Sequence, residues 1–203
     1  MMHNMHKNLA DLSLETLKKQ TPEQLQTQSV TAVLLALGSN YQAKHYLPLV
    51  RKDLAALGEI QLSTAFENPD FTSTKAQPKP DYTNQCVYLR LTKPVTLQQL
   101  QQVFKDLEGD CHRQRLTEAQ TPIKKVTMDI DILLIEKLLI EKLLIEVVSD
   151  KNSLSSNKEF EESNWIVMAD RYPFKAHERA GVEELIKGHF LKGHMKQPRC
   201  YSK

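Results

Sequence analysis

The sequence predicts an α+β domain in which helices pack against an antiparallel sheet. Three observations support this prediction. Four segments between residues 30 and 134 have strand-like patterning, two segments between them carry apolar residues at helical spacing, and the order is β-α-β-β-α-β. Elements with one apolar face bury it against each other, so this order implies a sheet covered by helices.

Composition indicates one soluble domain and excludes several classes of protein. The 203 residues suffice for one domain of typical size plus terminal extensions. A net charge of +2 is too small to indicate a nucleic-acid or membrane surface, and no segment approaches the roughly 20 apolar residues of a membrane span. Cys86, Cys111 and Cys200 lack CxxC spacing, as in a reducing compartment. We expect a cytoplasmic monomer without nucleic-acid or membrane partners.

The chain divides into three predicted regions. Residues 1–29, rich in Gln, Lys, Thr and Asn, are expected to form a tail in which a short helix can occur. Residues 30–188 form the predicted domain, and residues 189–203 form a second tail. Within the domain, residues 149–164 are rich in Ser, Asn, Glu and Lys, which predicts a mobile surface loop.

The first half of the domain begins with a buried strand. VTAVLLALGSN, at 30–40, is an apolar run that ends in a Gly-Ser-Asn turn. Residues 45–58 have apolar side chains at helical spacing and end at Gly58, as helices often do. Residues 60–66 alternate like a strand.

The second half begins after a loop at 67–81, which contains three prolines. Residues 82–91 alternate again, and residues 96–111 form an amphipathic helix. A polar connection at 112–125 leads into the strand VTMDIDILL, residues 126–134. The resulting order is the split-βαβ, ferredoxin-like arrangement, with helices on one face of a four-stranded antiparallel sheet.

A five-residue repeat follows this last strand. LLIEK occurs at 133–137 and at 138–142, and LLIE occurs at 143–146. A period of five keeps no single face apolar on either a strand or a helix. We interpret the repeat as a local duplication that lengthens the strand, or the segment after it, beyond any site.

The DxD sequence in the last strand is the first candidate site. Side chains alternate along a strand, so Asp129 and Asp131 share one face while Met128, Ile130 and Ile132 face the core. Two carboxylates about 7 Å apart on one face suit a divalent cation such as Mg²⁺, which keeps positions open for water and phosphate. The alternative is two acids on a solvated strand face.

Two further clusters accompany the carboxylates. HRQR at 112–115 and the lysines at 124–125 lie on the connection into the same strand, and guanidinium groups bind phosphate oxygens in pairs. Tyr82 and Asn84 share a strand face, where a ring and an amide can stack and read a flat heterocycle. A solvated basic loop and an ordinary strand are the alternatives. No P-loop, GxGxxG, zinc-ligand or GxSxG pattern occurs.

Four segments in order resemble the 6-hydroxymethyl-7,8-dihydropterin pyrophosphokinase family of folate biosynthesis. They are LALGSN, NPDF with PDYTNQCVYL, LEGDCHRQR and TMDIDILL, within residues 35–134. The resemblance implies a ferredoxin-like core and an ATP-dependent diphosphotransferase. Such an enzyme transfers the β,γ-pyrophosphate of ATP to the pterin hydroxymethyl group and releases AMP, with two Mg²⁺ ions.

The resemblance also implies roles for individual residues. Asp129 and Asp131 would be metal ligands, as well as catalytic residues, and Tyr82, Asn84 and Pro69 would form the pterin pocket.

The nucleotide side of the site follows from the same resemblance. Arg113 and Arg115 match the paired arginines of the family's mobile catalytic loop, and Glu108 matches the glutamate of the preceding helix.

The chain departs from the family pattern at two places on the nucleotide side. Val126 stands where the family has an arginine, and Lys124 or Lys125 can supply a point charge there without the guanidinium fork. A PHP-like segment whose histidine holds the nucleotide is absent, and His177 or Arg179 can substitute for it.

Two other functions remain open at this point. A catalytically impaired relative would bind pterin or nucleotide as a regulatory or interaction module, and would produce no AMP. A ferredoxin-like RNA-binding module would need exposed aromatic residues on the central strands and a basic sheet face. Neither is visible in the sequence, and the carboxylates of Asp129 and Asp131 would repel a phosphate backbone.

Overall fold

A computed structural model describes residues 14–70, 73–76, 78–113, 125–138 and 165–194, and for 189–194 the backbone alone. Arg115, Lys124, nearly all of the second LLIEK copy, the third copy and the predicted loop at 149–164 lie outside these residues.

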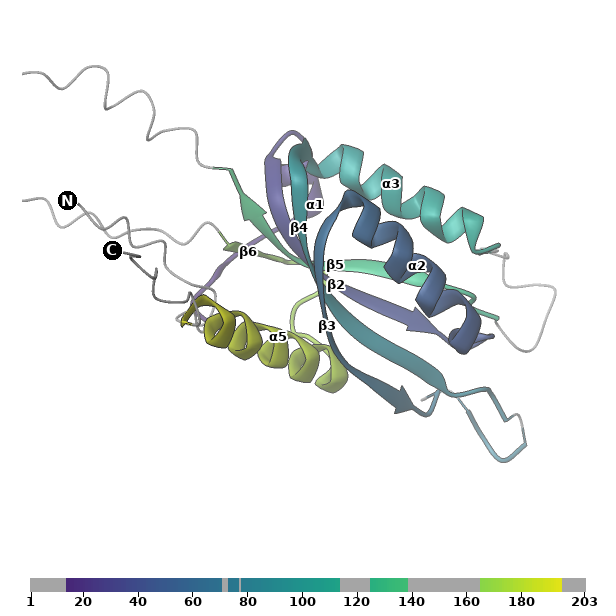
Figure 1. The fold of residues 1–203 in the computed structure, drawn as a ribbon. Helices are drawn as coiled ribbons and strands as arrows, with labels where there is room; N and C mark the ends of the chain where they lie inside the picture. Colours follow the sequence, from purple (N-terminus) through teal and green to yellow (C-terminus); the bar gives the residue numbers. More distant parts are fainter. Residues whose placement is uncertain (1–13, 71–72, 77, 114–124, 139–164, 195–203) are drawn as a thin grey trace, which may run out of the picture.

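The predicted β-α-β-β-α-β order and the antiparallel core are confirmed, within a larger sheet (Figure 1). Six strands lie in the order β1-β6-β5-β2-β4-β3, and every neighbouring pair is antiparallel except β1 with β6. The strands are β1 Lys18–Gln20, β2 Ser29–Ser39, β3 Gly58–Asn68, β4 Tyr82–Thr96, β5 Asp129–Lys137 and β6 Trp165–Met168.

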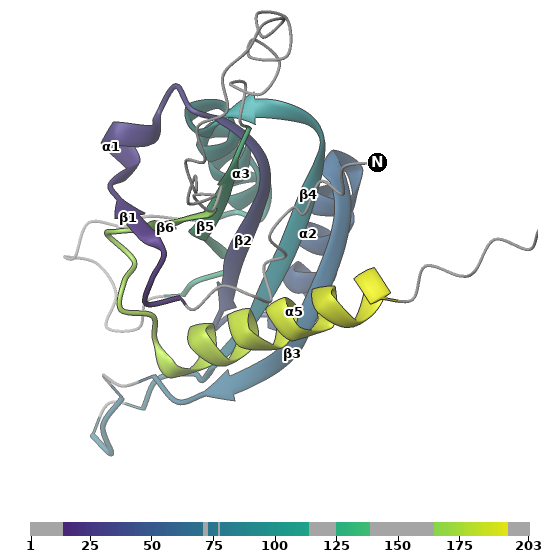
Figure 2. The same ribbon diagram turned by 90° about the vertical axis from the view of Figure 1, so that its left-hand side faces the viewer.

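Helices cover both faces of the sheet, whereas the sequence led us to expect helices on one face. Helices α2 (Ala43–Leu57) and α3 (Leu97–Asp110) lie on one face, and α5 (Ala176–His194) crosses the other (Figures 1 and 2). The reason lies in the central strand β2, where alternate residues pack into two separate apolar clusters. A strand that is apolar on both sides requires cover on both sides.

Part of the predicted N-terminal tail belongs to the fold. Leu14 and Leu17 are buried in the cluster beneath α5, and β1 pairs in parallel with β6. The short helix α1 (Pro22–Leu25) buries Leu25 in the opposite cluster. Helix α5 also continues beyond the predicted boundary at residue 188. No helix in the described part of the chain is long and apolar enough to cross a membrane.

The register of β5 places its two aspartates on the α5 face. Asp129 pairs with Gly38 and Asp131 pairs with Ala36, while Ile130 and Ile132 pack into the core beneath α2 and α3. The predicted alternation of acids and core residues is therefore confirmed, and the acids lie on the face opposite to the two predicted helices.

A β-bulge at Leu133 interrupts the pairing just beyond the aspartates. Leu134 pairs with Leu34 and Ile132 pairs with Leu35, so that Leu133 is one extra residue in β5. Leu133 and Leu134 consequently both pack into the α5-side cluster, although they are consecutive. The first LLIEK copy thus forms the end of β5.

Glu108 of α3 supports β5 between the two aspartates. The residue is 5% exposed, and its carboxylate accepts a hydrogen bond from the Ile130 backbone N–H at 2.9 Å. This hydrogen bond fixes the position of β5 relative to α3, because leaving the buried Ile130 N–H without an acceptor would cost free energy.

Replacing Glu108 with alanine should lower the free energy of unfolding by about 1–3 kcal/mol, because the buried Ile130 N–H loses its charged acceptor. Urea unfolding monitored by circular dichroism measures this change. Glu108→Gln keeps an acceptor oxygen and should lose less. Equal stability of the alanine variant and the parent protein would contradict the supporting role.

Gly181 sets how closely α5 approaches β4. A Cβ atom there would lie 2.7 Å from the Cys86 Sγ and 2.9 Å from its Cβ, whereas a Cβ at Gly188 would meet nothing within 4 Å. Gly181→Ala should therefore destabilise the protein by about 1–3 kcal/mol through overpacking. Gly188→Ala should leave stability unchanged or raise it by up to about 1 kcal/mol.

The same urea experiment tests the contact directly. Adding Cys86→Ala to Gly181→Ala should restore part of the lost stability, since it removes the Sγ atom, the nearest of the atoms that the new methyl group meets. If both glycine substitutions changed stability equally, the close approach would not be a constraint on the fold.

Candidate active site

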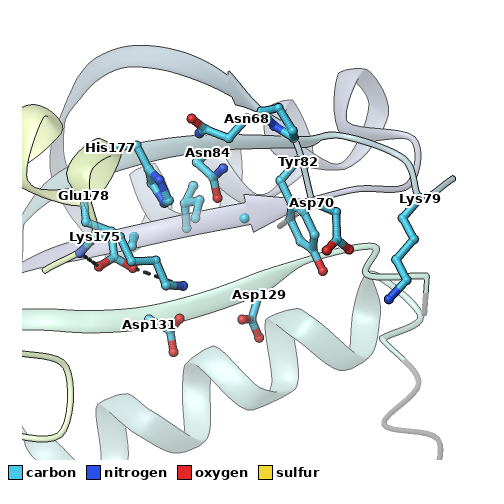
Figure 3. A pocket seen from close by; sticks show the side chains of 14 residues that line it. Asn68, Asp70, Lys79, Tyr82, Asn84, Asp129, Asp131, Lys175, His177 and Glu178 are labelled. Carbon is cyan, nitrogen blue, oxygen red and sulfur yellow. Dashed lines mark hydrogen bonds and ion pairs between the residues drawn. The ribbon is translucent and has the colours of Figure 1, made fainter. Parts of the chain in front are cut away.

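A cavity of about 380 Å³ opens between the sheet and the beginning of α5 (Figure 3). Its size falls in the range of small-molecule sites. The cavity is lined by several of the residues that the sequence predicted for the site: Pro69, Tyr82, Asn84, Asp129, Asp131 and His177. They come from three strands or strand ends and from α5, so the fold brings together side chains that are far apart in the sequence.

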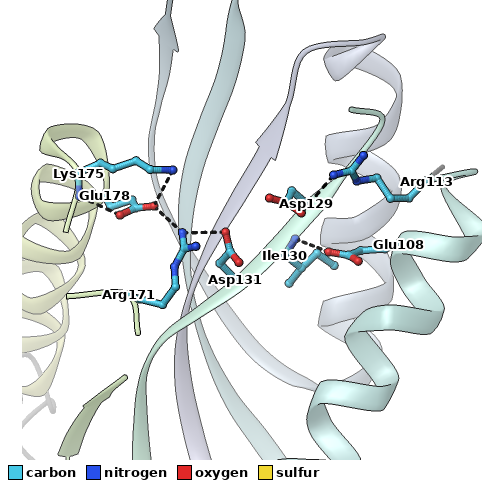
Figure 4. A network of polar contacts seen from close by, with 8 residues as sticks. All are labelled: Glu108, Arg113, Asp129, Ile130, Asp131, Arg171, Lys175 and Glu178. Carbon is cyan, nitrogen blue, oxygen red and sulfur yellow. Dashed lines mark hydrogen bonds and ion pairs between the residues drawn. The ribbon is translucent and has the colours of Figure 1, made fainter. Parts of the chain in front are cut away.

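The two aspartates lie side by side along one wall of this cavity (Figure 3). Their side chains are 38% and 31% exposed, and each has an arginine nearby. An Nη atom of Arg113 lies 3.8 Å from an Oδ of Asp129, and an Nη atom of Arg171 lies 2.8 Å from an Oδ of Asp131 (Figure 4).

The pKa of Asp131 is nevertheless raised to about 6. Burial is the main cause, the negative charge of Asp129 is the second, and the attraction of Arg171 only partly opposes them. The 2.8 Å ion pair with Arg171 would by itself favour the ionised carboxylate, so the two observations point in opposite directions. The raised pKa and the ion pair together show that a positive charge beside Asp131 favours its ionised form.

The turn after β2 holds the start of β5. The Asn40 side-chain oxygen accepts a hydrogen bond from the Val126 N–H at 2.6 Å. The Val126 carbonyl accepts from the Asn40 N–H, the Tyr41 N–H and the Ser39 hydroxyl. The Ser-Asn of the LGSN motif thus anchors the chain three residues before Asp129. Val126 itself is buried, so its side chain fills core space.

Three other predicted residues lie outside the cavity wall. Glu108 supports β5 from beneath, and Lys125 places its Nζ 4.8 Å from the Tyr41 ring centroid. Arg179 forms ion pairs with Glu15 and Glu183 outside the cavity.

Arg113, which follows the end of α3, also lies outside the cavity wall, but its Nη atom lies 3.8 Å from the Asp129 carboxylate. Arg115 and Lys124 are not among the described residues.

The turn before α5 and the first turn of α5 supply three charged residues that the sequence did not lead us to predict: Arg171, Lys175 and Glu178. Glu178 is 3% exposed, and Arg171 bridges it to Asp131, with distances of 3.0 and 2.8 Å (Figure 4). Lys175 lines the cavity beside Glu178 and donates its backbone N–H to the Glu178 carboxylate at 2.9 Å. Glutamate three residues after the helix N-cap is a recognised helix-start signal that could have located the beginning of α5.

The far end of the cavity, beyond Tyr82, carries Asp70 and Lys79 (Figure 3). The pKa of Tyr82 is raised, chiefly by burial and then by the charges of Asp70 and Asp129. At the α5 end, burial lowers the pKa of His177, which favours the neutral imidazole. The cavity thus combines an aromatic ring, an amide and a neutral imidazole above two carboxylates.

Comparison with known proteins identifies the family. A family model, 7,8-dihydro-6-hydroxymethylpterin-pyrophosphokinase (HPPK), matches residues 34–155, which is more than half of the chain. A search among curated proteins gave no significant match. The matched range contains both aspartates and the Tyr82–Asn84 strand, whereas β1, β6 and α5 lie outside it. The chain belongs to the HPPK family, which transfers pyrophosphate from ATP to hydroxymethyldihydropterin in folate biosynthesis.

Proposed function

We propose that the cavity between the sheet and α5 is where this diphosphokinase brings ATP and the pterin together. One observation carries the proposal: Asp129 and Asp131 share a cavity with Tyr82 and Asn84. Carboxylates suited to a metal–phosphate complex then lie next to groups suited to a flat heterocycle, as a transfer between these two substrates requires.

We assign Mg²⁺ binding, with two ions, to Asp129 and Asp131. Within the described residues no three His, Cys, Asp or Glu side chains gather into a metal site, so the metal ligands assigned in this part of the chain are these two carboxylates. Mg²⁺ commonly binds through one or two carboxylates, with water and substrate phosphates completing its coordination. The raised pKa of Asp131 also indicates a carboxylate that gains from a nearby cation. Bound Mg²⁺ would neutralise triphosphate oxygens and polarise the attacking hydroxyl group.

The pterin is assigned to the part of the cavity formed by Pro69, Tyr82 and Asn84. The Asn84 Oδ1 lies 3.2 Å from the position that a Cβ on Gly38 would occupy, so glycine leaves room for this amide. An amide offers both a donor and an acceptor to the edge of a heterocycle, and the phenol ring offers a stacking face. Glycine at residue 38 therefore serves the pterin side of the site.

The nucleotide is assigned to the part of the cavity between Arg113 and the start of α5. Arg113 contacts Asp129, and Lys175 and His177 line the wall that α5 contributes. Arg115 and Lys124 keep their predicted nucleotide roles. Arg179 has two acidic partners outside the cavity, which favours His177 over Arg179 as the substitute for the family's histidine.

Within this arrangement the protein acts mainly by positioning. Tyr82 and Asn84 orient the pterin so that its hydroxymethyl oxygen faces the wall formed by the aspartates. The hydroxyl group gives its proton to water as its oxygen attacks the β-phosphorus of ATP, the bond from that phosphorus to the oxygen bridging to the α-phosphate breaks, and AMP leaves with that oxygen. Arg113 can offset negative charge as AMP departs. We further propose that the protein is a monomer and that it is cytoplasmic; the free, buried thiols of Cys86 and Cys111 suit a reducing compartment.

Incubation with ATP, Mg²⁺ and 6-hydroxymethyl-7,8-dihydropterin should yield AMP, and Asp129→Asn or Asp131→Asn should slow its formation at least about a hundredfold, because the charge-stabilising metal is lost. Quantifying AMP by chromatography measures the rate. Asp106→Asn, on the exposed face of α3, is the matched control. Near-normal turnover in either cavity variant would refute the metal assignment.

Asn84→Ala should raise the KM for the pterin about tenfold or more, because the substrate's polar edge would lose its partner. The KM for ATP should change little. Steady-state kinetics with each substrate varied in turn separates the two effects. Gln102→Ala, which removes an exposed amide on α3, should alter neither constant. An unchanged pterin KM in the folded Asn84→Ala protein would place the pterin elsewhere.

A further inference from the structure

Arg171 links a proposed metal ligand to a buried acid on a different element. A single guanidinium nitrogen, Nη2, lies 2.8 Å from the Asp131 carboxylate and 3.0 Å from the Glu178 carboxylate (Figure 4). Its Nε–H is buried and has no hydrogen-bond partner among the described residues. The guanidinium therefore forms ion pairs with both carboxylates through Nη2, while its Nε–H donor stays unused.

The Glu178 end of this bridge is firmly fixed. Glu178 is almost fully buried, accepts the Lys175 backbone N–H at 2.9 Å and lies 3.7 Å from the Lys175 ammonium group. The turn that carries Arg171 is fixed as well, because the Arg171 N–H bonds the Met168 carbonyl. At the other end of the bridge, a bound metal cation would compete with Arg171 for the Asp131 carboxylate.

The charges around the aspartates are balanced without a metal. Asp129, Asp131 and Glu178 are each within ion-pair distance of Arg113, Arg171 or Lys175, so three acids face three bases. Glu108 adds a fourth acid, but its carboxylate accepts from a backbone N–H beneath the strand. A divalent cation that enters alone must compete with Arg171 for Asp131.

We propose that Arg171 is a displaceable counter-ion: it holds Asp131 in the metal-free protein and transfers to a nucleotide phosphate when Mg²⁺ and ATP bind. Glu178 retains one side of the guanidinium throughout, so that the arginine stays at the metal site after it releases Asp131. The free Nε–H and the released Nη then form the pair of donors that binds two phosphate oxygens. This inference rests on the proposed role of Asp131 as a metal ligand.

The proposal requires effects of opposite sign on two binding reactions. Without nucleotide, Arg171 competes with the metal, so its removal should tighten metal binding. With nucleotide, Arg171 binds phosphate, so its removal should weaken nucleotide binding. A residue that only stabilises the fold would weaken both reactions or neither.

Mn²⁺ binding to the full chain, followed by the paramagnetic resonance signal of the free ion, tests the first effect. Arg171→Gln, which removes the positive charge but keeps a polar amide, should bind Mn²⁺ about threefold more tightly or better without nucleotide. Calorimetry with Mg²⁺ and α,β-methylene ATP, which cannot react, tests the second effect. Its affinity should fall about tenfold, since hydrogen bonds between charged groups are lost.

Two further variants complete the experiment. Arg90→Gln removes an exposed arginine of β4 outside the cavity and should change neither affinity. Arg171→Lys keeps the charge without the fork, so its Mn²⁺ affinity should stay near that of the parent while nucleotide affinity falls.

The outcomes separate this inference from the metal assignment. If Asp131→Asn weakens Mn²⁺ binding while Arg171→Gln leaves it unchanged or weaker, the counter-ion proposal is wrong and the metal assignment stands. If Asp131→Asn binds Mn²⁺ as well as the parent protein does, with or without the nucleotide analogue, both are wrong. No Mn²⁺ binding by the parent or by Arg171→Gln also overturns the proposal.

Discussion

Two carboxylates on the same face of one strand repel each other, and much of the surrounding structure compensates for that repulsion. The cost is visible in the raised pKa of Asp131, to which Asp129 contributes after burial. Arg113 and Arg171 each place a cation beside one of the acids. The backbone that carries the acids is held independently, by Asn40 at Val126 and by Glu108 at Ile130. Such constraint of unfavourable charge is typical of functional sites.

The sheet separates this site from the main core. The faces of β2 and β5 under α2 and α3 are continuously apolar, whereas the other face is apolar near β6 and polar near the aspartates. Helix α5 begins where this change occurs, so its first turn supplies charged side chains and its later residues pack on leucines. One helix therefore both covers the second core and closes the site, through elements outside the matched family range.

The sequence allowed prediction of the parts of the fold that have clear periodicity. Alternation gave the shared face of Asp129 and Asp131, and helical spacing gave α2 and α3. Strands β1 and β6 have three and four residues, too few to show a period, and they form only because neighbouring strands and leucines hold them. The apolar residues of α5 likewise show little helical periodicity, so the sequence does not indicate which face of this helix packs against the sheet.

The cavity residues on regular strands could be placed from their spacing, whereas those in turns and at the start of a helix could not. Tyr82, Asn84 and the aspartates lie on regular strands, where the spacing of residues determines direction. Arg171 and Glu178 meet through a turn and a helix start, which local sequence patterns describe poorly. The choice between His177 and Arg179 depended on the rotation of α5 about its own axis. That rotation is set by tertiary contacts, including the close approach at Gly181.

The bulge at Leu133 has a consequence for how this sequence can change. Pairing of β5 with β2 follows one register from Asp129 to Ile132 and another from Leu134 to Glu136. In the first part of β5, the side chains must alternate so that Asp129 and Asp131 face the cavity. After Leu133, the extra residue shifts which side chains face each side of the sheet. Duplications that begin after this shift alter chain length without rotating either aspartate to the wrong face. The LLIEK repeat begins at Leu133, the residue where length becomes free to vary.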